Sequence, residues 1–244
     1  MEKQLHRMRF TPGPMSIRQP QKLPPRLWQK QLNFFAYVEE GREIVCFSIS
    51  NSMSTSGNVM RLAAGELEAE NRITVIDSAN LSTGIGLLVI EAAIMAKNGH
   101  SASEIASVME TLKPNVRASF VVDTLTYLYR GGRCNAVAAM AGGVLKLHPK
   151  IVVENGAMDA TKKYRGKINS VIMSYVKDME TDLKAARPDR VFITHSGCDA
   201  ATVESVRSYL ESLGIFHEIL ETRAGGVVSS HCGPGTLGVL FIAK

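Results

Sequence analysis

The sequence predicts an α/β protein built from two sheets. Apolar, strand-like runs alternate with helical patterns from Phe34 onward, and several helix ends carry capping or stop signals. The pair Asn155-Gly156 lies between two short strand-like runs and is a strong hairpin signal. A chain of 244 residues is long enough for one large domain or two small ones.

In the first half, strands and helices follow one another in turn. The expected elements are a strand at 43–49, a helix near 59–70, a strand at 72–76, a helix at 84–97, a helix from 101 to 112 and a strand at 119–122. Ser101 and Glu104 form a capping box at the start of the third helix, and Pro114 follows its end.

The second half continues this alternation after a less regular stretch. The expected elements are short helical pieces around 127–129 and 136–145, hairpin strands at 150–153 and 158–161, a helix at 167–185, a strand at 190–194, a helix at 200–213, a strand at 216–220, a glycine turn and a strand at 237–242. Two sheet units that separate near 123–150 follow from this layout, with a ligand crevice between them.

Three regions therefore organise the chain. Residues 1–33 hold five of the nine prolines and seven Lys or Arg against one Glu, which predicts a basic, poorly ordered arm. Residues 34–122 are expected to form a first α/β domain. Residues 123–244 are expected to form a second one, including the linker helices and the hairpin.

The charge distribution argues against a nucleic-acid partner. The net charge is +5 in total and +6 in residues 1–33, so residues 34–244 carry −1. A nucleic-acid binder is expected to have a basic folded surface as well. We find no signal-peptide pattern and no apolar run of about 18 residues, so a cytoplasmic protein with at most transient membrane contact is expected.

A cluster of hydroxyl side chains is the first candidate site. Five serines and a threonine occur between Ser48 and Ser56, after a predicted strand and before a predicted helix. Open α/β sheets bind ligands at this place, where the helix N-terminus offers N–H donors to an anion. The alternative is that Ser54 or Ser56 only caps the helix.

The second candidate site is the segment from His231 to Gly238. Glycine and proline allow close approach of the backbone to a ligand, and free N–H groups beside His231 can receive a carboxylate or phosphate. The alternative is a structural turn with a bystander histidine.

Other reactive residues have simpler interpretations. Cys232 is a conceivable nucleophile, but a small residue packed in a turn is favoured, and Cys46 and Cys198 are expected to be buried. Asp77 and Asp123 follow predicted strands, where turn or capping roles are favoured over acid–base catalysis. The four cysteines have no metal-binding spacing, and we expect neither a metal nor a cofactor.

Taken in order, several segments resemble the DegV family of bacterial fatty-acid-binding proteins. These segments are Ser48 to Asn58, Val75-Ile76-Asp77-Ser78, Phe120 to Leu128, Arg130-Gly131-Gly132-Arg133 and His231-Cys232-Gly233-Pro234-Gly235. The resemblance covers about residues 34–244. It implies a two-domain DegV-like fold with each sheet flanked by helices, and a long-chain acyl group in an apolar tunnel between the domains.

The resemblance also implies a role. Family members present the fatty acid to a separate ATP-binding subunit of fatty acid kinase, which phosphorylates the carboxylate, so no catalytic residue is expected in this chain. The implied ligand-binding residues are Ser54, Ser56, His231, Gly233, Gly235, Arg130 and Arg133. Arg130 and Arg133 can contact the carboxylate or the kinase, or can instead tie the two domains together.

Two departures from the family pattern qualify this expectation. Thr55 stands where the family usually has glycine, and the family's opening strand and Thr-Ser-Gln-Pro-Ser segment are absent, with only Gln19-Pro20 in common. The first domain is therefore expected to be incomplete, as in a truncated or frameshifted reading frame. The alternatives are a stand-alone hydrolase or transferase that uses His231, and a degraded relative that binds nothing.

Overall fold

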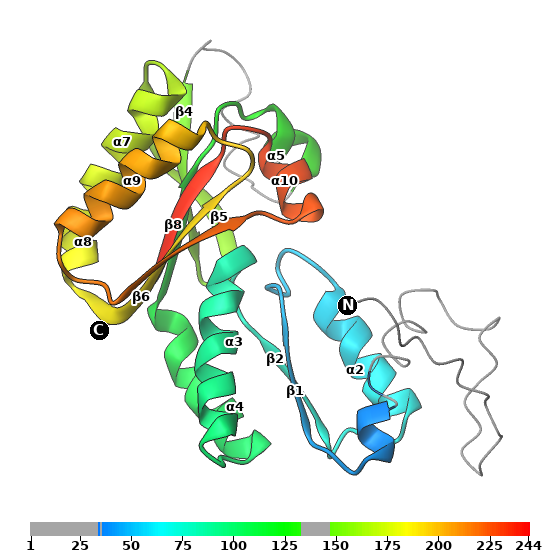
Figure 1. Cartoon of the computed structure of the whole chain (residues 1–244). Coiled ribbons are helices and arrows are strands. Elements are labelled where there is room, and N and C mark those ends of the chain that lie inside the picture. The colour runs from blue at the N-terminus through cyan, green and yellow to red at the C-terminus, as the bar shows by residue number, and fades with distance from the viewer. Residues whose placement is uncertain (1–33, 35, 133–146) are drawn as a thin grey trace, which may run out of the picture.

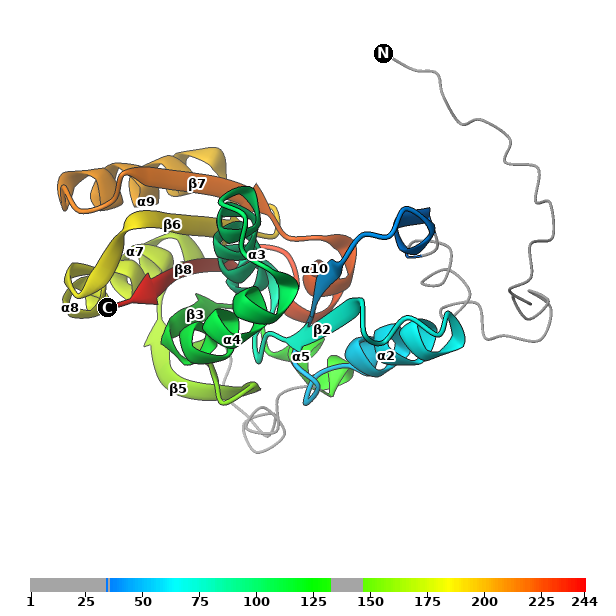
Figure 2. The same cartoon turned by 90° about the horizontal axis from the view of Figure 1, so that it is seen from below.

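The computed structural model describes residues 34, 36–132 and 147–244. Two sheets lie at opposite ends of the molecule, with a pair of helices between them (Figures 1 and 2). The arm predicted at 1–33, the residue Arg133 and the helical piece expected at 136–145 lie outside the described residues.

The described elements follow the predicted alternation closely. The first are β1 (Ile44–Ser48), α2 (Ser56–Glu66), β2 (Ile73–Asp77), α3 (Ser82–Lys97), α4 (Ala102–Leu112), a 3₁₀ turn at Lys113–Asn115, β3 (Val116–Val121) and α5 (Thr126–Gly131). The remainder are β4 (Leu147–Glu154), β5 (Ala157–Arg165), α7 (Ile168–Asp178), α8 (Glu180–Lys184), β6 (Ala186–His195), α9 (Ala200–Ser212), β7 (Glu218–Arg223), α10 (Gly226–Cys232) and β8 (Leu237–Ala243).

The small sheet is a parallel pair, β1 and β2, in register from Ile44 opposite Ile73 to Ser48 opposite Asp77. The side chain of Cys46 packs towards α2, whereas that of Phe47 packs into the core that contains α3. Because both faces of the sheet are covered, β1 is a continuous apolar run up to Phe47, and β2 has Thr74 as its one polar residue before Asp77.

The large sheet has six strands in the order β5-β4-β3-β8-β6-β7. All neighbours are antiparallel except β6 and β7, which are parallel. Helices α7, α8 and α9 lie along one face, and α3 crosses the other (Figure 2). The sheets do not divide where the sequence suggested, after Val122, because β3 pairs with β4 and β8 in the large sheet.

Two local predictions are confirmed in detail. The side chains of Ser101 and Glu104 form both bonds of the capping box at the start of α4. At the tip of the β4–β5 hairpin, Asn155 has φ +50° and Gly156 has φ +79°. Two positive φ values at the central residues are the requirement of the type I′ turn that favours Asn-Gly.

Two other predictions are corrected. The single helix expected over 167–185 is divided at Met179 into α7 and α8. The segment expected as a glycine turn contains the seven-residue helix α10, which packs against α5. Its glycine, valines and serines are weak helix formers, so no local pattern predicted this helix.

Helix α3 forms the common wall of the two sheets. Its Leu87 and Leu88 side chains are fully buried in a cluster that also contains Ile76 from the small sheet and Phe120 and Leu240 from the large one. Glu91 and Lys97 are the only charged residues of this helix. A helix that is apolar on nearly every side needs neighbours on more than one face.

An ion-pair cluster ties α3 to β6. The Glu91 carboxylate is 2.5 Å from Arg190 Nη1 and 3.1 Å from Arg187 Nη2. Arg190 also pairs with Glu218, and Arg187 with Asp189. The side chains of Glu91 and Arg190 are only 16% and 12% exposed, so water screens their attraction less than at an open surface.

We expect Glu91→Ala to lower the free energy of unfolding by about 2 kcal/mol, because it removes a shared partner from two guanidinium groups that each keep one carboxylate. Urea unfolding measures this difference. The matched control is Glu204→Ala, since Glu204 is 67% exposed and lies 3.9 Å from Arg207. The control is expected to cost less than about 1 kcal/mol, and equal losses would contradict a special role for Glu91.

Candidate functional site

The loop that joins β1 to α2, here called the serine loop (residues 49–55), places two predicted hydroxyl groups together. Ser54 Oγ and Ser56 Oγ are 2.8 Å apart, and both residues are half-buried. The Ser56 N–H donates to Ser54 Oγ at 3.2 Å, whereas the N-cap residue Thr55 makes no capping bond through its side chain. Ser54 therefore satisfies one N–H of the first turn of α2, as the capping alternative predicted, with a second hydroxyl beside it.

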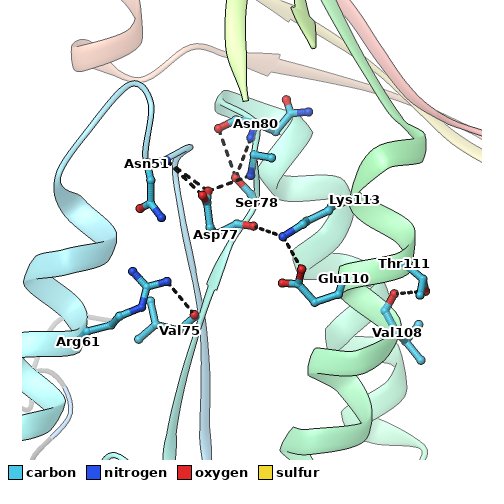
Figure 3. Close-up of polar contacts among 11 residues, drawn as sticks. Asn51, Arg61, Val75, Asp77, Ser78, Asn80, Val108, Glu110, Thr111 and Lys113 are labelled. Carbon is cyan, nitrogen blue, oxygen red and sulfur yellow. Dashed lines mark hydrogen bonds and ion pairs between the residues drawn. The ribbon is translucent and has the colours of Figure 1, made fainter. Parts of the chain in front are cut away.

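Next to this loop, Asp77 caps the turn that follows β2 (Figure 3). Its carboxylate accepts from the Ala79 N–H at 3.0 Å and faces the Asn51 N–H at 3.3 and 3.4 Å. The turn role predicted for Asp77 is thus confirmed. Lys113 Nζ donates to the Asp77 carbonyl and pairs with Glu110, while Arg61 Nη2 donates to the Val75 carbonyl.

The second candidate segment lies against α5 through contacts at two glycines. A Cβ at Gly131 would overlap the His231 ring, and a Cβ at Gly233 would overlap the Tyr127 ring. Gly235 has φ +74°, and a Cβ there would lie 3.6 Å from Asp123 Cβ. The fold therefore brings together motifs that are about a hundred residues apart in the sequence.

Only one of the two predicted arginines lies within the described residues. Arg130 is exposed on α5 beside Gly131, and Arg133 lies outside the described residues. Within the described chain, arginines that tie an α3 carboxylate to the large sheet do occur, but they are Arg187 and Arg190. Their spacing gave no motif, so the sequence did not indicate them.

A pocket opens between the start of α3, the helix α10 and the large sheet. It is lined by Leu81, Ser82, Phe120, Thr194, His195, Ser196, Ala224, Val228, Cys232, Thr236, Gly238 and Leu240. None of the predicted site residues is among these, although the pocket contains the immediate neighbours of His231 and Gly235. Helix α10, which supplies Val228 and Cys232, lies over the carboxyl end of β1 in both views of the chain (Figures 1 and 2).

The polar side chains of the pocket largely bond within the protein. Thr194 Oγ1 is 2.5 Å from Thr83 Oγ1 and 2.9 Å from Thr222 Oγ1. Ser196 Oγ donates to the Gly233 carbonyl, and Thr236 Oγ1 donates to the Cys232 carbonyl at 3.0 Å. Because these hydroxyl groups already form hydrogen bonds within the protein, a ligand in the pocket would contact mainly carbon atoms.

His195 on the pocket wall is also fully engaged. Its Nδ1 accepts from the Cys198 N–H at 3.2 Å, so Nε2 carries the hydrogen and faces Glu221 Oε1 at 3.3 Å. The Arg207 guanidinium beside Glu221 holds the pKa of that carboxyl below its usual value, and His195 adds to the effect. In the sequence, His195 and the hydroxyl residue Ser196 directly follow the strand predicted at 190–194. Polar residues after a predicted strand also pointed to the serine loop, but these two were not predicted as site residues.

Burial makes the cysteines of this region poor nucleophiles. It raises the pKa of the Cys232 thiol to about 12, and burial with the nearby Asp199 raises that of Cys198 to about 11. The thiolate is the reactive form, so both groups stay protonated at neutral pH. The prediction that Cys232 is a small packed residue is confirmed, since it is 5% exposed.

Other site types are not found in the described part of the chain. No group of three or more His, Cys, Asp or Glu side chains is placed to hold a metal ion there. Within the same residues, no helix has the length and apolar character needed to cross a membrane.

Comparison with known proteins gives the family. A model for the DegV family, described as uncharacterised protein, matches residues 24–244. A DegV domain-containing protein of Deinococcus radiodurans is 31% identical over 83% of this chain and 70% of its own length. A DegV domain-containing protein from Caldanaerobacter subterraneus is 33% identical. The match covers 74% of this chain and 64% of that relative's length.

Solved structures agree with this match. A DegV family protein of Thermus thermophilus, described by its fatty acid binding, superposes with a TM-score of 0.78 at 27% identity, over 89% of this chain and 77% of that one. A stearic acid-binding protein of Eubacterium ventriosum has a TM-score of 0.76 at 27% identity, over 89% and 76% of the two chains. The two-sheet fold, the paired motifs on α5 and α10 and these matches lead to one conclusion: the chain belongs to the DegV family.

Proposed function

We propose that this protein binds a long-chain fatty acid between its two sheets, with the acyl chain starting in the pocket beside Cys232 and the carboxylate near Ser54 and His231. The observation that carries the proposal is a pocket whose polar groups are mostly bonded within the protein. The hydroxyl groups of the serine loop are the candidate headgroup contacts. The fatty-acid-binding proteins among the structural relatives support the same ligand class.

Burial of the chain supplies most of the binding free energy. Removing a CH₂ group from water is worth about 0.8 kcal/mol, so about fifteen groups give roughly 12 kcal/mol before the costs of ordering the ligand. The apolar cluster around α3 continues from the pocket walls at Phe120 and Leu240 into both sheets. A hydrocarbon guest is favoured there over a polar one, because a polar guest would find few unsatisfied partners.

The headgroup sets the orientation. In this proposal Ser54 and Ser56 donate hydroxyl hydrogens to the carboxylate at the N-terminus of α2, where the helix dipole also favours an anion. His231 donates from the opposite side. The N–H groups of Gly233 and Gly235, expected to be free for an anion, already donate to the Ser229 and Ser196 carbonyls at 2.8 and 3.2 Å, so the two glycines contribute only the close approach of their backbone. Arg130 and Arg133 are assigned to the carboxylate or to the partner protein.

A fatty acid bound in this way is held as a substrate for a second protein. We assign the phosphoryl transfer to a separate ATP-binding kinase subunit, as the resemblance to the family implies. The sequence given has no P-loop and no Gly-x-Ser-x-Gly motif. The protein then supplies burial and orientation, and the partner supplies the phosphoryl donor. The raised pKa of Cys232 disfavours this thiol as the nucleophile of the alternative, a stand-alone hydrolase or transferase that uses His231.

Freshly purified protein is expected to carry a C14–C18 fatty acid, because a chain buried between two sheets dissociates slowly. Native mass spectrometry, followed by denaturation and lipid identification, measures this directly. A folded protein that carries no lipid and takes up none when palmitate is added would instead support the non-binding relative.

Ser54→Ala is expected to weaken palmitate binding by about 1.5–3 kcal/mol, the value of a hydrogen bond to a charged group. Titration of delipidated protein gives the dissociation constants. Ser103→Ala is the matched control, because Ser103 Oγ also lies near another serine hydroxyl, Ser101 Oγ at 3.2 Å, but on the exposed start of α4. Unchanged affinity in Ser54→Ala would remove Ser54 from the site.

A further inference from the structure

A buried serine connects the serine loop to the opposite sheet. Ser50 is 1% exposed, and its Oγ donates to the carbonyl oxygen of Gly156 at 2.6 Å. Gly156 is at the tip of the β4–β5 hairpin, which belongs to the large sheet, whereas Ser50 follows β1 of the small sheet. The tip of the hairpin therefore reaches across to the candidate headgroup loop.

The same serine also shapes that loop. Its carbonyl oxygen accepts from the N–H groups of Met53 at 2.9 Å and Ser54 at 3.1 Å. Its Oγ accepts from the Ser52 N–H at 3.2 Å, and its own N–H donates to the Asn80 carbonyl at 2.9 Å. Ser50 is thus bonded to the loop after β2, to the hairpin tip and to the residue that carries the candidate hydroxyl, Ser54.

The hairpin tip fits this contact closely. A Cβ at Gly156 would lie 2.7 Å from Ser50 Oγ and 3.6 Å from Ser52 Oγ. A side chain is thus disfavoured at this position twice, by the positive φ of +79° and by the close approach of the serine. Met53 from the loop and Met158 from β5 are both buried in the same apolar cluster, so the two segments also contribute to one core.

We propose that Ser50 and Gly156 form a positioning contact, through which the β4–β5 hairpin of the large sheet holds Ser54 in the geometry that receives the ligand's carboxylate. This inference rests on the proposed function. Ser50 itself is buried and bonded to protein, so it acts through Ser54 and touches no ligand. The contact makes recognition of the headgroup depend on the arrangement of the two sheets, while burial of the tail does not require it.

The test compares two ligands that differ only in the headgroup. Palmitate and methyl palmitate offer the same chain to the pocket, but only palmitate offers a carboxylate to the loop. We expect Ser50→Ala to weaken palmitate binding about tenfold and methyl palmitate binding less than about twofold. Without the Ser50 contact the serine loop must become ordered before it can bind a carboxylate, and only palmitate has one. Ser50→Thr keeps the hydroxyl and is expected to restore the preference for the acid.

A second variant tests the other side of the contact. Gly156→Ala is expected to act in the same direction as Ser50→Ala, because the new Cβ displaces the Ser50 hydroxyl. Gly99→Ala is its matched control, since Gly99 also has a positive φ of +88° but has nothing within 4 Å of an added Cβ. Thermal unfolding of all four variants reports general damage separately from the ligand preference.

Each outcome decides between distinct conclusions. The inference is overturned if Ser50→Ala keeps the wild-type ratio of palmitate to methyl palmitate affinity, whether both affinities are retained or both fall together. Failure of the wild-type protein to bind either ligand would overturn the proposed function and this inference with it. Loss of the preference in both Ser50→Ala and Gly156→Ala, but not in Gly99→Ala, supports the positioning contact.

Discussion

The burial of α3 between two sheets is the constraint on which the rest of the structure depends. This helix has two charged residues in sixteen, and its leucines contact a core to which both sheets contribute. Because such a helix cannot leave a broad face in water, it fixes the small sheet against the large one. The one carboxylate of α3, Glu91, pairs with two arginines of β6. These ion pairs fix how the helix is oriented on the large sheet, which apolar contact alone would not do. The candidate pocket lies at the start of this helix, where Leu81 and Ser82 face the large sheet.

Close packing onto glycine builds the other side of the site. His231 and Tyr127 lie reciprocally on Gly131 and Gly233, so the two short helices α5 and α10 approach more closely than side chains on those positions would allow. Neither helix exceeds seven residues, and neither would be stable alone in water. Their mutual contact replaces the stability that their length cannot provide. This explains in physical terms why the glycines of two distant motifs belong to one structural unit.

Local sequence patterns were sufficient to predict most helices and strands. They were not sufficient to predict which helices and strands pack against one another. Periodicity, the Ser101 capping box and the Asn155-Gly156 turn are local signals, and the corresponding elements lie where they were expected. The sheet to which β3 belongs and the existence of α10 depend on contacts between distant segments, which local patterns do not contain. The same limit applies to the site: the hydroxyl pair Ser54 and Ser56 was recognisable, whereas the contact of Ser50 with Gly156 became visible only when the sheets were in place.

A ligand between the sheets would be bound by groups that the fold itself must hold together. The serine loop depends on the hairpin tip of the opposite sheet, and the pocket wall combines α3, α10 and the large sheet. Any guest that contacts all of them binds the assembled arrangement and not its separated parts. By mass action, ligand at a hundred times its dissociation constant then adds about 2.7 kcal/mol to the stability of that arrangement. Helix α3 and an acyl chain bound as proposed would in this sense be stabilised by the same kind of interaction, the burial of apolar surface.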